Sequence, residues 1–225
     1  MSELECVLVG PHEGHDSTVI WLHGLGASGH DFEPVAPLFE MPNTRFVFPH
    51  APRMAVTINA GMRMPAWYDI KHLNWGQPDR EDEASIRMTA DLVAELLAEE
   101  HARGVPYERI VLAGFSQGGA LARHVGLRAS HKLAGIMCLS TYEVLADTRD
   151  AEAHDANATT PMLVQHGRFD DMVPMPMGQA AHARDAEGRE VRWDAYNMGH
   201  EVCMQQIRDI RDWLHTVLPQ SSSSA

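Results

Sequence analysis

Short, continuous apolar runs recur along the chain and alternate with segments whose apolar residues have helical spacing. The runs fall at residues 4–9, 18–22, 44–48, 109–115, 133–140, 161–166 and 190–196. Strands that are apolar on both faces are typical of a parallel sheet covered by helices on both sides. The alternation therefore predicts an α/β fold, with a mostly parallel central sheet between two layers of helices.

The predicted helices lie between these runs. The strongest spans residues 81–103, where Ile86, Val93 and Leu97 fall on one face and acidic residues come early. Further helices are predicted at residues 31–39, 117–128 and 203–218. Residues 54–75 and 147–160 show no clear period, and we expect irregular connections there.

Length and charge narrow the class of protein. The 225 residues suit a single domain over residues 1–219, followed by a Ser-rich, flexible tail at 220–225. A formal net charge of −13 argues against nucleic acid as a partner. The N-terminus carries Glu3 and Glu5 without Lys or Arg, and no apolar run approaches the length of a membrane span. We therefore expect a cytoplasmic protein without stable membrane insertion.

A glycine pattern, G-x-G-x-x-G, follows the second apolar run in "HGLGASGH" (residues 23–30). A dinucleotide site would also need an acidic residue about 20 positions on, at the end of the next strand. That strand ends instead in Pro49-His50-Ala51-Pro52. Two interpretations remain: a structural turn between strand and helix, or an oxyanion loop that directs the Leu25 N–H toward a site.

A candidate nucleophile lies in "AGFSQGGA" (residues 113–120), where Ser116 is the serine of G-x-S-x-G. The pattern follows a predicted strand and begins a predicted helix, which is the context of a nucleophile elbow. The Gln117 N–H would then lie at a helix N-terminus, where it could stabilise a developing oxyanion. The alternative, that Ser116 only caps the helix, does not explain a glycine two residues to either side.

A serine nucleophile needs a base, and in elbow enzymes an acid and then a histidine follow it, each after a strand. His200 follows the last strand and precedes the last helix, so it is the best candidate base. His166 also ends a strand, but it precedes the candidate acids and is better explained as structural. For the acid, spacing alone barely separates Asp170 from Asp171.

Six segments in order, "LHGLG", "FPHAP", "VTINAGMRMPAWYD", "GFSQGGA", "HGRFDDMVP" and "MGHE", resemble the phospholipase/carboxylesterase family, which includes acyl-protein thioesterases. The resemblance implies an α/β-hydrolase fold without a large cap domain, no metal and no organic cofactor, and it suggests a homodimer. It implies a triad of Ser116, Asp170 (the Asp of HG-x-x-D) and His200, with Leu25 and Gln117 as the oxyanion N–H donors. Asp171 stands where many relatives have proline, so it is not expected to act.

The expected activity is that of a serine carboxylesterase, which hydrolyses small, short- to medium-chain esters through an acyl-enzyme. Thr141-Tyr142 stands where acyl-protein thioesterases usually have Ser-Gly, which favours the bacterial carboxylesterase branch. An acyl-protein thioesterase or lysophospholipase is the alternative, and a catalytically silent binding protein is a third interpretation. The candidate acyl-pocket walls, each of which could equally be ordinary core, are Trp67, Leu73, Met172, Val173 and Met175.

Overall fold

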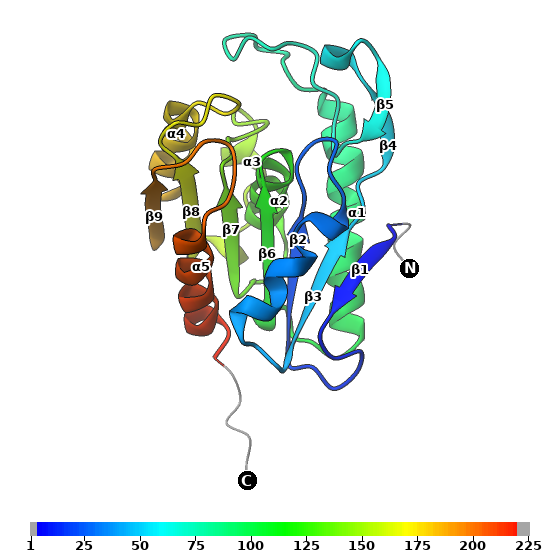
Figure 1. The fold of residues 1–225 in the computed structure, drawn as a ribbon, viewed down its shortest axis with the longest axis vertical. Coiled ribbons are helices and arrows are strands. Elements are labelled where there is room, and N and C mark those ends of the chain that lie inside the picture. Colours follow the sequence, from blue (N-terminus) through cyan, green and yellow to red (C-terminus); the bar gives the residue numbers. More distant parts are fainter. Residues whose placement is uncertain (1–3, 220–225) are drawn as a thin grey trace.

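The computed structural model describes residues 4–219 and contains a seven-stranded central sheet (Figure 1). Its strand order is β1-β3-β2-β6-β7-β8-β9, and every neighbouring pair is parallel except β1 with β3. The strands are β1 (Cys6–Val9), β2 (Ser17–Leu22), β3 (Thr44–Pro49), β6 (Ile110–Phe115), β7 (Gly135–Leu139), β8 (Met162–Gly167) and β9 (Val191–Tyr196). The predicted mostly parallel sheet is confirmed.

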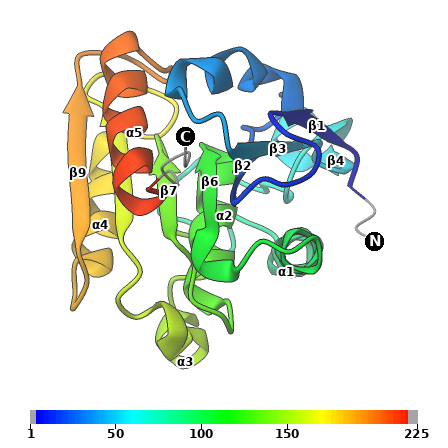
Figure 2. The same ribbon diagram turned by 90° about the horizontal axis from the view of Figure 1, so that it is seen from below.

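Helices cover both faces of this sheet (Figure 2). One face carries α1 (Glu83–Ala102), α2 (Gln117–Arg128) and α4 (Met175–Asp185), and the other carries α5 (Met204–Val217) with the 3-10 helices η1 (Gly29–Asp31) and η2 (Glu33–Phe39). Each face has its own apolar cluster, with Ile20 and Leu112 on the α1–α2 side and Trp21 and Ala113 on the α5 side. Burial on both faces explains why these strands are continuous apolar runs.

The segments expected to be irregular are partly ordered. Residues 54–75 contain most of an antiparallel hairpin, formed by β4 (Arg53–Val56) and β5 (Met62–Pro65) with η3 (Thr57–Asn59) between the strands. Residues 147–160 contain two short helices, α3 (Arg149–Glu152) and η5 (Asp155–Asn157). Another short helix, η4 (Tyr107–Arg109), precedes β6. The hairpin forms its own two-stranded sheet and is largely exposed, so its residues lack the apolar period that burial on a core imposes.

Helix α4 was not predicted. Its buried residues are Gly178, Ala181 and Asp185, which are small or charged and give no apolar stripe for a sequence pattern to detect. Residues 31–39, expected to be one helix, form η1 and η2 instead, and Pro34 and Pro37 in this stretch lack the N–H groups that an α-helical ladder would use.

Parallel strands direct their carboxyl ends to one edge of the sheet, at the top of Figure 1. The loops after β2, β6, β7, β8 and β9 therefore meet there, and such edges are where α/β proteins bind ligands. No separate cap domain covers this edge within residues 4–219, as expected. No helix in the same range combines the length and hydropathy needed to cross a bilayer.

Candidate active site

Ser116 occupies a strained turn between β6 and α2. Its φ of 54° and ψ of −120° lie in a region that non-glycine residues rarely adopt. The glycines on either side permit a close approach, because a Cβ on Gly114 would lie 2.2 Å from the Gly118 carbonyl oxygen, and one on Gly118 would lie 2.4 Å from the His23 oxygen. The Ser116 N–H donates to the Leu139 carbonyl at 2.9 Å. The turn has the geometry of a nucleophile elbow and presents the serine at the sheet edge.

Three side chains from three strand ends form one hydrogen-bonded chain. His200 Nε2 lies 2.9 Å from Ser116 Oγ, and His200 Nδ1 lies 2.8 Å from Asp170 Oδ2. Ser116 follows β6, Asp170 follows β8 and His200 follows β9. Residues 84 positions apart are thus within hydrogen-bond distance, as nucleophilic catalysis by a serine requires.

Asp170 is held as a buried, ionised carboxylate. Burial alone would raise its pKa, but the hydrogen bonds from His200 and from the Val173 N–H outweigh burial and hold the pKa below its ordinary value. Oδ1 accepts the N–H groups of Met172 and Val173 at 3.0 and 2.8 Å. Because the carboxylate can only accept, His200 Nδ1 carries the proton and Nε2 is free to accept one from Ser116.

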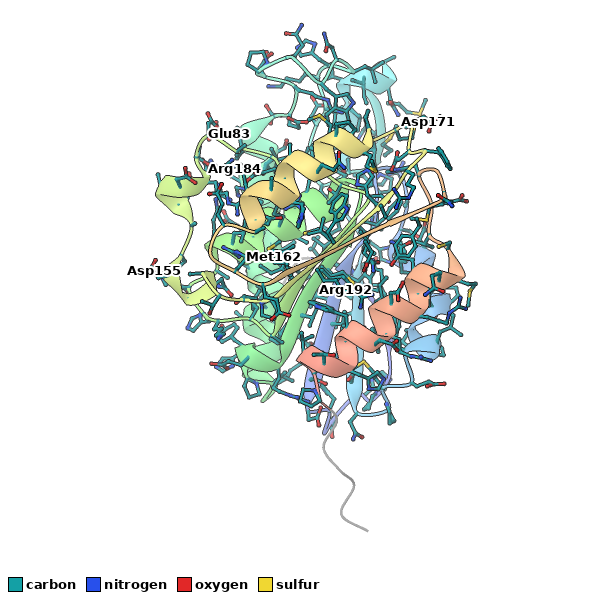
Figure 3. All side chains as sticks on the ribbon, turned by 90° about the vertical axis from the view of Figure 1, so that its left-hand side faces the viewer. Glu83, Asp155, Met162, Asp171, Arg184 and Arg192 are labelled. Atoms are coloured by element: carbon teal, nitrogen blue, oxygen red, sulfur yellow. The ribbon has the colours of Figure 1, made fainter. Side chains whose placement is uncertain are left out.

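Of the two neighbouring aspartates, only Asp170 reaches His200. Asp171 is exposed and lies at the outer surface near the start of α4 (Figure 3). The turn closed by the Asp170 carboxylate directs the two side chains apart. The geometry thus favours the HG-x-x-D assignment over its neighbour.

His166 lies beside this chain without joining it. Its Nε2 lies 2.8 Å from the Val173 carbonyl oxygen, to which it donates, and 3.6 Å from Asp170 Oδ2. The side chain is fully buried at the end of β8, and this burial lowers its pKa. His166 is thus a neutral ring bonded to the loop that carries Asp170, which fits the structural role expected from the sequence.

The glycine-rich loop after β2 lies against the serine. Gly24 and Leu25 line the same cavity as Ser116 and Gln117. The Gln117 side chain is occupied elsewhere, since Oε1 accepts the Trp67 N–H and Nε2 donates to the Tyr68 carbonyl, both at 2.8 Å. Gln117 is also the first residue of α2, and a helix N-terminus favours negative charge.

His23 precedes the predicted oxyanion loop, and the sequence analysis assigned its ring no role. The Ala51 N–H donates to its Nε2 at 3.0 Å, and its Nδ1–H donates to the Gly24 carbonyl at 2.7 Å. Burial lowers the pKa of His23, which keeps the ring neutral and fits it to this pair of bonds. The ring thereby fixes the turn that precedes Leu25, and the His-Gly pair at a strand end was the signal available in the sequence.

A cavity of about 550 Å³ opens over Ser116 and His200. Leu73, Met172 and Val173 line it, whereas Trp67 and Met175 are absent from its described lining. The prediction that Trp67 forms a wall is wrong: its side chain is completely buried, and its indole N–H donates to the His23 carbonyl at 2.8 Å. Met175 instead begins α4. Further lining residues, which the sequence analysis did not propose as walls, are Ala27, Asp31, Phe32, Ile58, Ile70, Trp75, Arg80, Phe115, Tyr142, Glu201 and Val202.

The chemistry available here is acyl transfer. A serine with a base in contact, a carboxylate that orients the base, and N–H groups beside the serine are the parts that attack on a carbonyl needs. Within residues 4–219, no group of three or more His, Cys, Asp or Glu side chains is arranged to hold a metal ion.

The chain is similar to known proteins in sequence and in overall structure. A model of the phospholipase/carboxylesterase family matches residues 5–218. An acyl-protein thioesterase 1 from Cryptococcus neoformans is 35% identical over 96% of this chain and 99% of its own. The crystal structure of SOBER1 from Arabidopsis thaliana superposes with a TM-score of 0.84 at 32% identity, over 90% of this chain and 99% of that one. Acyl-protein thioesterase 2 from Zea mays gives a TM-score of 0.83 at 27% identity, over 95% and 99%.

Proposed function

The chain belongs to the phospholipase/carboxylesterase family and has the α/β-hydrolase fold, and from this premise we propose that it is a serine hydrolase that cleaves small carboxylic esters through an acyl-enzyme. The observation that carries the proposal is His200, whose two ring nitrogens lie 2.9 Å from Ser116 Oγ and 2.8 Å from Asp170 Oδ2. A ring held in this way can take the serine proton and is stabilised as an imidazolium by the carboxylate.

In the proposed reaction, Ser116 Oγ attacks the ester carbonyl carbon while His200 Nε2 takes the hydroxyl proton. The Leu25 and Gln117 N–H groups stabilise the oxyanion. His200 then gives the proton to the leaving alcohol oxygen, and the acyl group stays on Ser116. Water, deprotonated by His200, attacks the acyl-enzyme and releases the carboxylic acid.

A thioester is the second candidate substrate, and the relatives favour it. Proteins named acyl-protein thioesterase 1 from Cryptococcus neoformans and Gibberella zeae are 35% and 36% identical to this chain. The proposed machinery suits a thioester equally well, since the attack and the oxyanion are the same. Thr141 and Tyr142, which favoured the carboxylesterase branch in the sequence, do not exclude it: Thr141 Oγ1 donates to the Ser116 carbonyl at 2.6 Å, and Tyr142 lines the cavity.

A substrate series tests the proposal and separates the candidates. Values of kcat/KM are measured on p-nitrophenyl esters from acetate to palmitate and on a palmitoyl thioester, with Ser116→Ala as the matched control. We expect Ser116-dependent hydrolysis with the highest kcat/KM on short to medium acyl chains. A clear preference for the palmitoyl thioester would favour an acyl-protein thioesterase. If neither esters nor the thioester are hydrolysed in a Ser116-dependent way, the interpretation as a catalytically silent binding protein is favoured.

Location in the cytoplasm and assembly as a homodimer also belong to the proposal. Light scattering of the purified protein tests the second, and a monomer mass at micromolar concentration would contradict it.

A further inference from the structure

A buried arginine lies in the wall of the proposed active-site cavity. Arg80 is the one Lys or Arg among the described residues that line this cavity. Its side chain is 8% exposed, although arginine is seldom buried without a specific partner. The triad and the oxyanion donors do not use it, so its position needs a separate explanation.

Two aromatic rings fix the guanidinium in place. Arg80 Cζ lies 3.7 Å from the ring centroid of Trp75 and 5.2 Å from that of Tyr142, and these two rings meet edge to face at 4.7 Å. The Tyr142 hydroxyl is itself held 2.8 Å from that of Tyr68. We call Trp75, Arg80 and Tyr142 the arginine corner. The guanidinium of Arg80 is held against these two rings and is therefore pre-organised to bind a planar anion such as a carboxylate.

The counterion of Arg80 does not occupy the cavity. Arg80 forms an ion pair with its chain neighbour Glu81 through Nη1, and its Nε has no hydrogen-bond partner among the described residues. Glu81 is absent from the described cavity lining. The guanidinium also bonds the Tyr142 side chain, and its unpartnered Nε is buried. Arg80 itself lines the cavity whereas Glu81 does not, so the positive member of the pair is on the cavity side, where a terminal guanidinium N–H would donate to an acceptor on a bound molecule.

The position of the proposed general acid, His200, indicates which part of the cavity holds the leaving alcohol. His200 must pass its proton to the leaving oxygen, so the alcohol lies on the His200 side of the cavity. His200 contacts Phe115 at 4.8 Å between ring centroids, and Phe115 contacts Phe32 at 5.7 Å. The carboxylates in the lining, Asp31 and Glu201, are sequence neighbours of Phe32 and His200. With the leaving alcohol placed against this group, the acyl chain is placed along the rest of the lining, which includes the arginine corner.

Building on the proposed ester hydrolysis, we propose that the arginine corner binds a carboxylate at the distal end of the acyl chain. The substrate class is then half-esters of medium-length dicarboxylic acids. Arg80 takes no part in bond making or breaking, and acts by selecting and placing the acyl group. Ile70, which also lines the cavity, offers apolar contact to a methylene chain.

The test compares two ester series that differ only at the distal end. Mono-p-nitrophenyl esters of adipic, pimelic and suberic acid are paired with the same compounds carrying a methyl ester on the far carboxyl. The readout is the ratio of kcat/KM for the acid to kcat/KM for its methyl ester, which cancels any loss shared by both substrates. In the wild-type enzyme we expect a ratio above one for at least one chain length.

Substitutions of Arg80 and of Glu81 should move this ratio in opposite directions. Arg80→Met should lower it about tenfold, as expected for the loss of one charge-assisted hydrogen bond, and Arg80→Lys should restore part of it. Glu81→Gln removes the competing carboxylate and should raise it. If Arg80 only stabilises the surrounding loop, Arg80→Met and Glu81→Gln would lower activity on both substrates equally and leave the ratio unchanged.

Each result decides the proposal. A ratio that stays within about twofold of wild type in Arg80→Met, or that does not rise in Glu81→Gln, overturns the carboxylate subsite. Glu81→Gln decides the question if Arg80→Met does not fold. Failure of the proposed esterase function looks different, because wild-type enzyme would then hydrolyse neither the charged nor the neutral series.

Discussion

His166 and His200 approach the same carboxylate, and both follow strands, yet their surroundings differ. His200 Nδ1 lies 2.8 Å from Asp170 Oδ2, its other nitrogen contacts Ser116, and its side chain is 18% exposed. His166 Nε2 lies 3.6 Å from the same oxygen, bonds the Val173 carbonyl, and is fully buried. A cavity opens beside His200, whereas the ring of His166 packs against Gly178 of α4, where an added Cβ would lie 2.4 Å from Nδ1.

The difference shows what separates a base from a structural histidine. Proximity to a carboxylate is common to both, so it does not identify the base. The base must also present its second nitrogen to the nucleophile and reach the space where substrate binds. His166 meets neither condition: its ring packs against α4, and among residues 4–219 its polar contacts are with Val173 and Asp170, both in the loop after β8.

The largest effect should come from His200→Gln. Without the imidazole, Ser116 has no group to take its proton, and losses of triad members cost on the order of 10⁴ to 10⁶ in turnover. Initial rates on p-nitrophenyl acetate measure it, with circular dichroism to show that the protein is folded. Activity within tenfold of wild type would show that His200 is not the base and would contradict the distinction drawn between His200 and His166.

The next effect separates the neighbouring aspartates. Asp170→Asn keeps the shape but presents an amide to His200, which disfavours the productive tautomer and costs roughly 10⁴ in turnover in a comparable triad. Asp171→Asn is the matched control, because Asp171 is exposed and should change turnover by less than about threefold. If Asp171→Asn is the inactive variant, the acid is one residue further along than the structure indicates.

His166→Gln should affect stability more than chemistry. Glutamine can still donate to the Val173 carbonyl but does not fill the space of the ring, so the unfolding free energy should fall by about 1–3 kcal/mol. Turnover should fall by less than about 100-fold, since Asp170 keeps its bonds to the Met172 and Val173 N–H groups. Urea unfolding and kcat are measured on the same preparation. A loss of turnover as large as that of His200→Gln would mean that both histidines take part in proton transfer.

The smallest effect is a pH dependence of stability. Burial lowers the pKa values of His166, His23 and His124, the last to about 4. These rings stay neutral in the folded protein but bind protons in the unfolded chain at the ordinary value of about 6.5, so the unfolding free energy should fall as the pH drops below that value. Urea midpoints between pH 7.5 and pH 4.5 measure the slope, and His166→Gln should flatten it. An identical slope in the variant would show that His166 is not held neutral.

Sequence patterns located the parts of the site that depend on local geometry. A serine in this strained turn needs glycine at positions 114 and 118, so the G-x-S-x-G motif alone predicts the local geometry of the turn. His200 could be selected because it follows the last strand of a parallel sheet. Asp170 and Asp171 could not be separated by spacing, since one turn positions both, and only its closure by the Met172 and Val173 N–H groups buries Asp170.

The rest of the cavity depends on packing between distant segments. Trp67 was expected in the wall because it is large and apolar, but hydrogen bonds to Gln117 and His23 hold it in the core. Arg80 was not singled out at all, because a charged residue after an irregular stretch is ordinarily solvated. Its burial results from stacking on Trp75 and Tyr142, and Tyr142 lies 62 positions from Arg80 in the sequence (142 − 80).

The central claim is that Ser116 is a nucleophile activated by His200 and oriented through Asp170. A fluorophosphonate probe tests it directly, because it phosphonylates only an activated serine and needs no knowledge of the natural substrate. After incubation, the intact mass and the peptide that carries the adduct are determined for the wild-type protein and for His200→Gln. The account predicts a single adduct on Ser116 in the wild type and at most a trace in His200→Gln. An adduct on another residue, or equal labelling of Ser116 in both proteins, would contradict it.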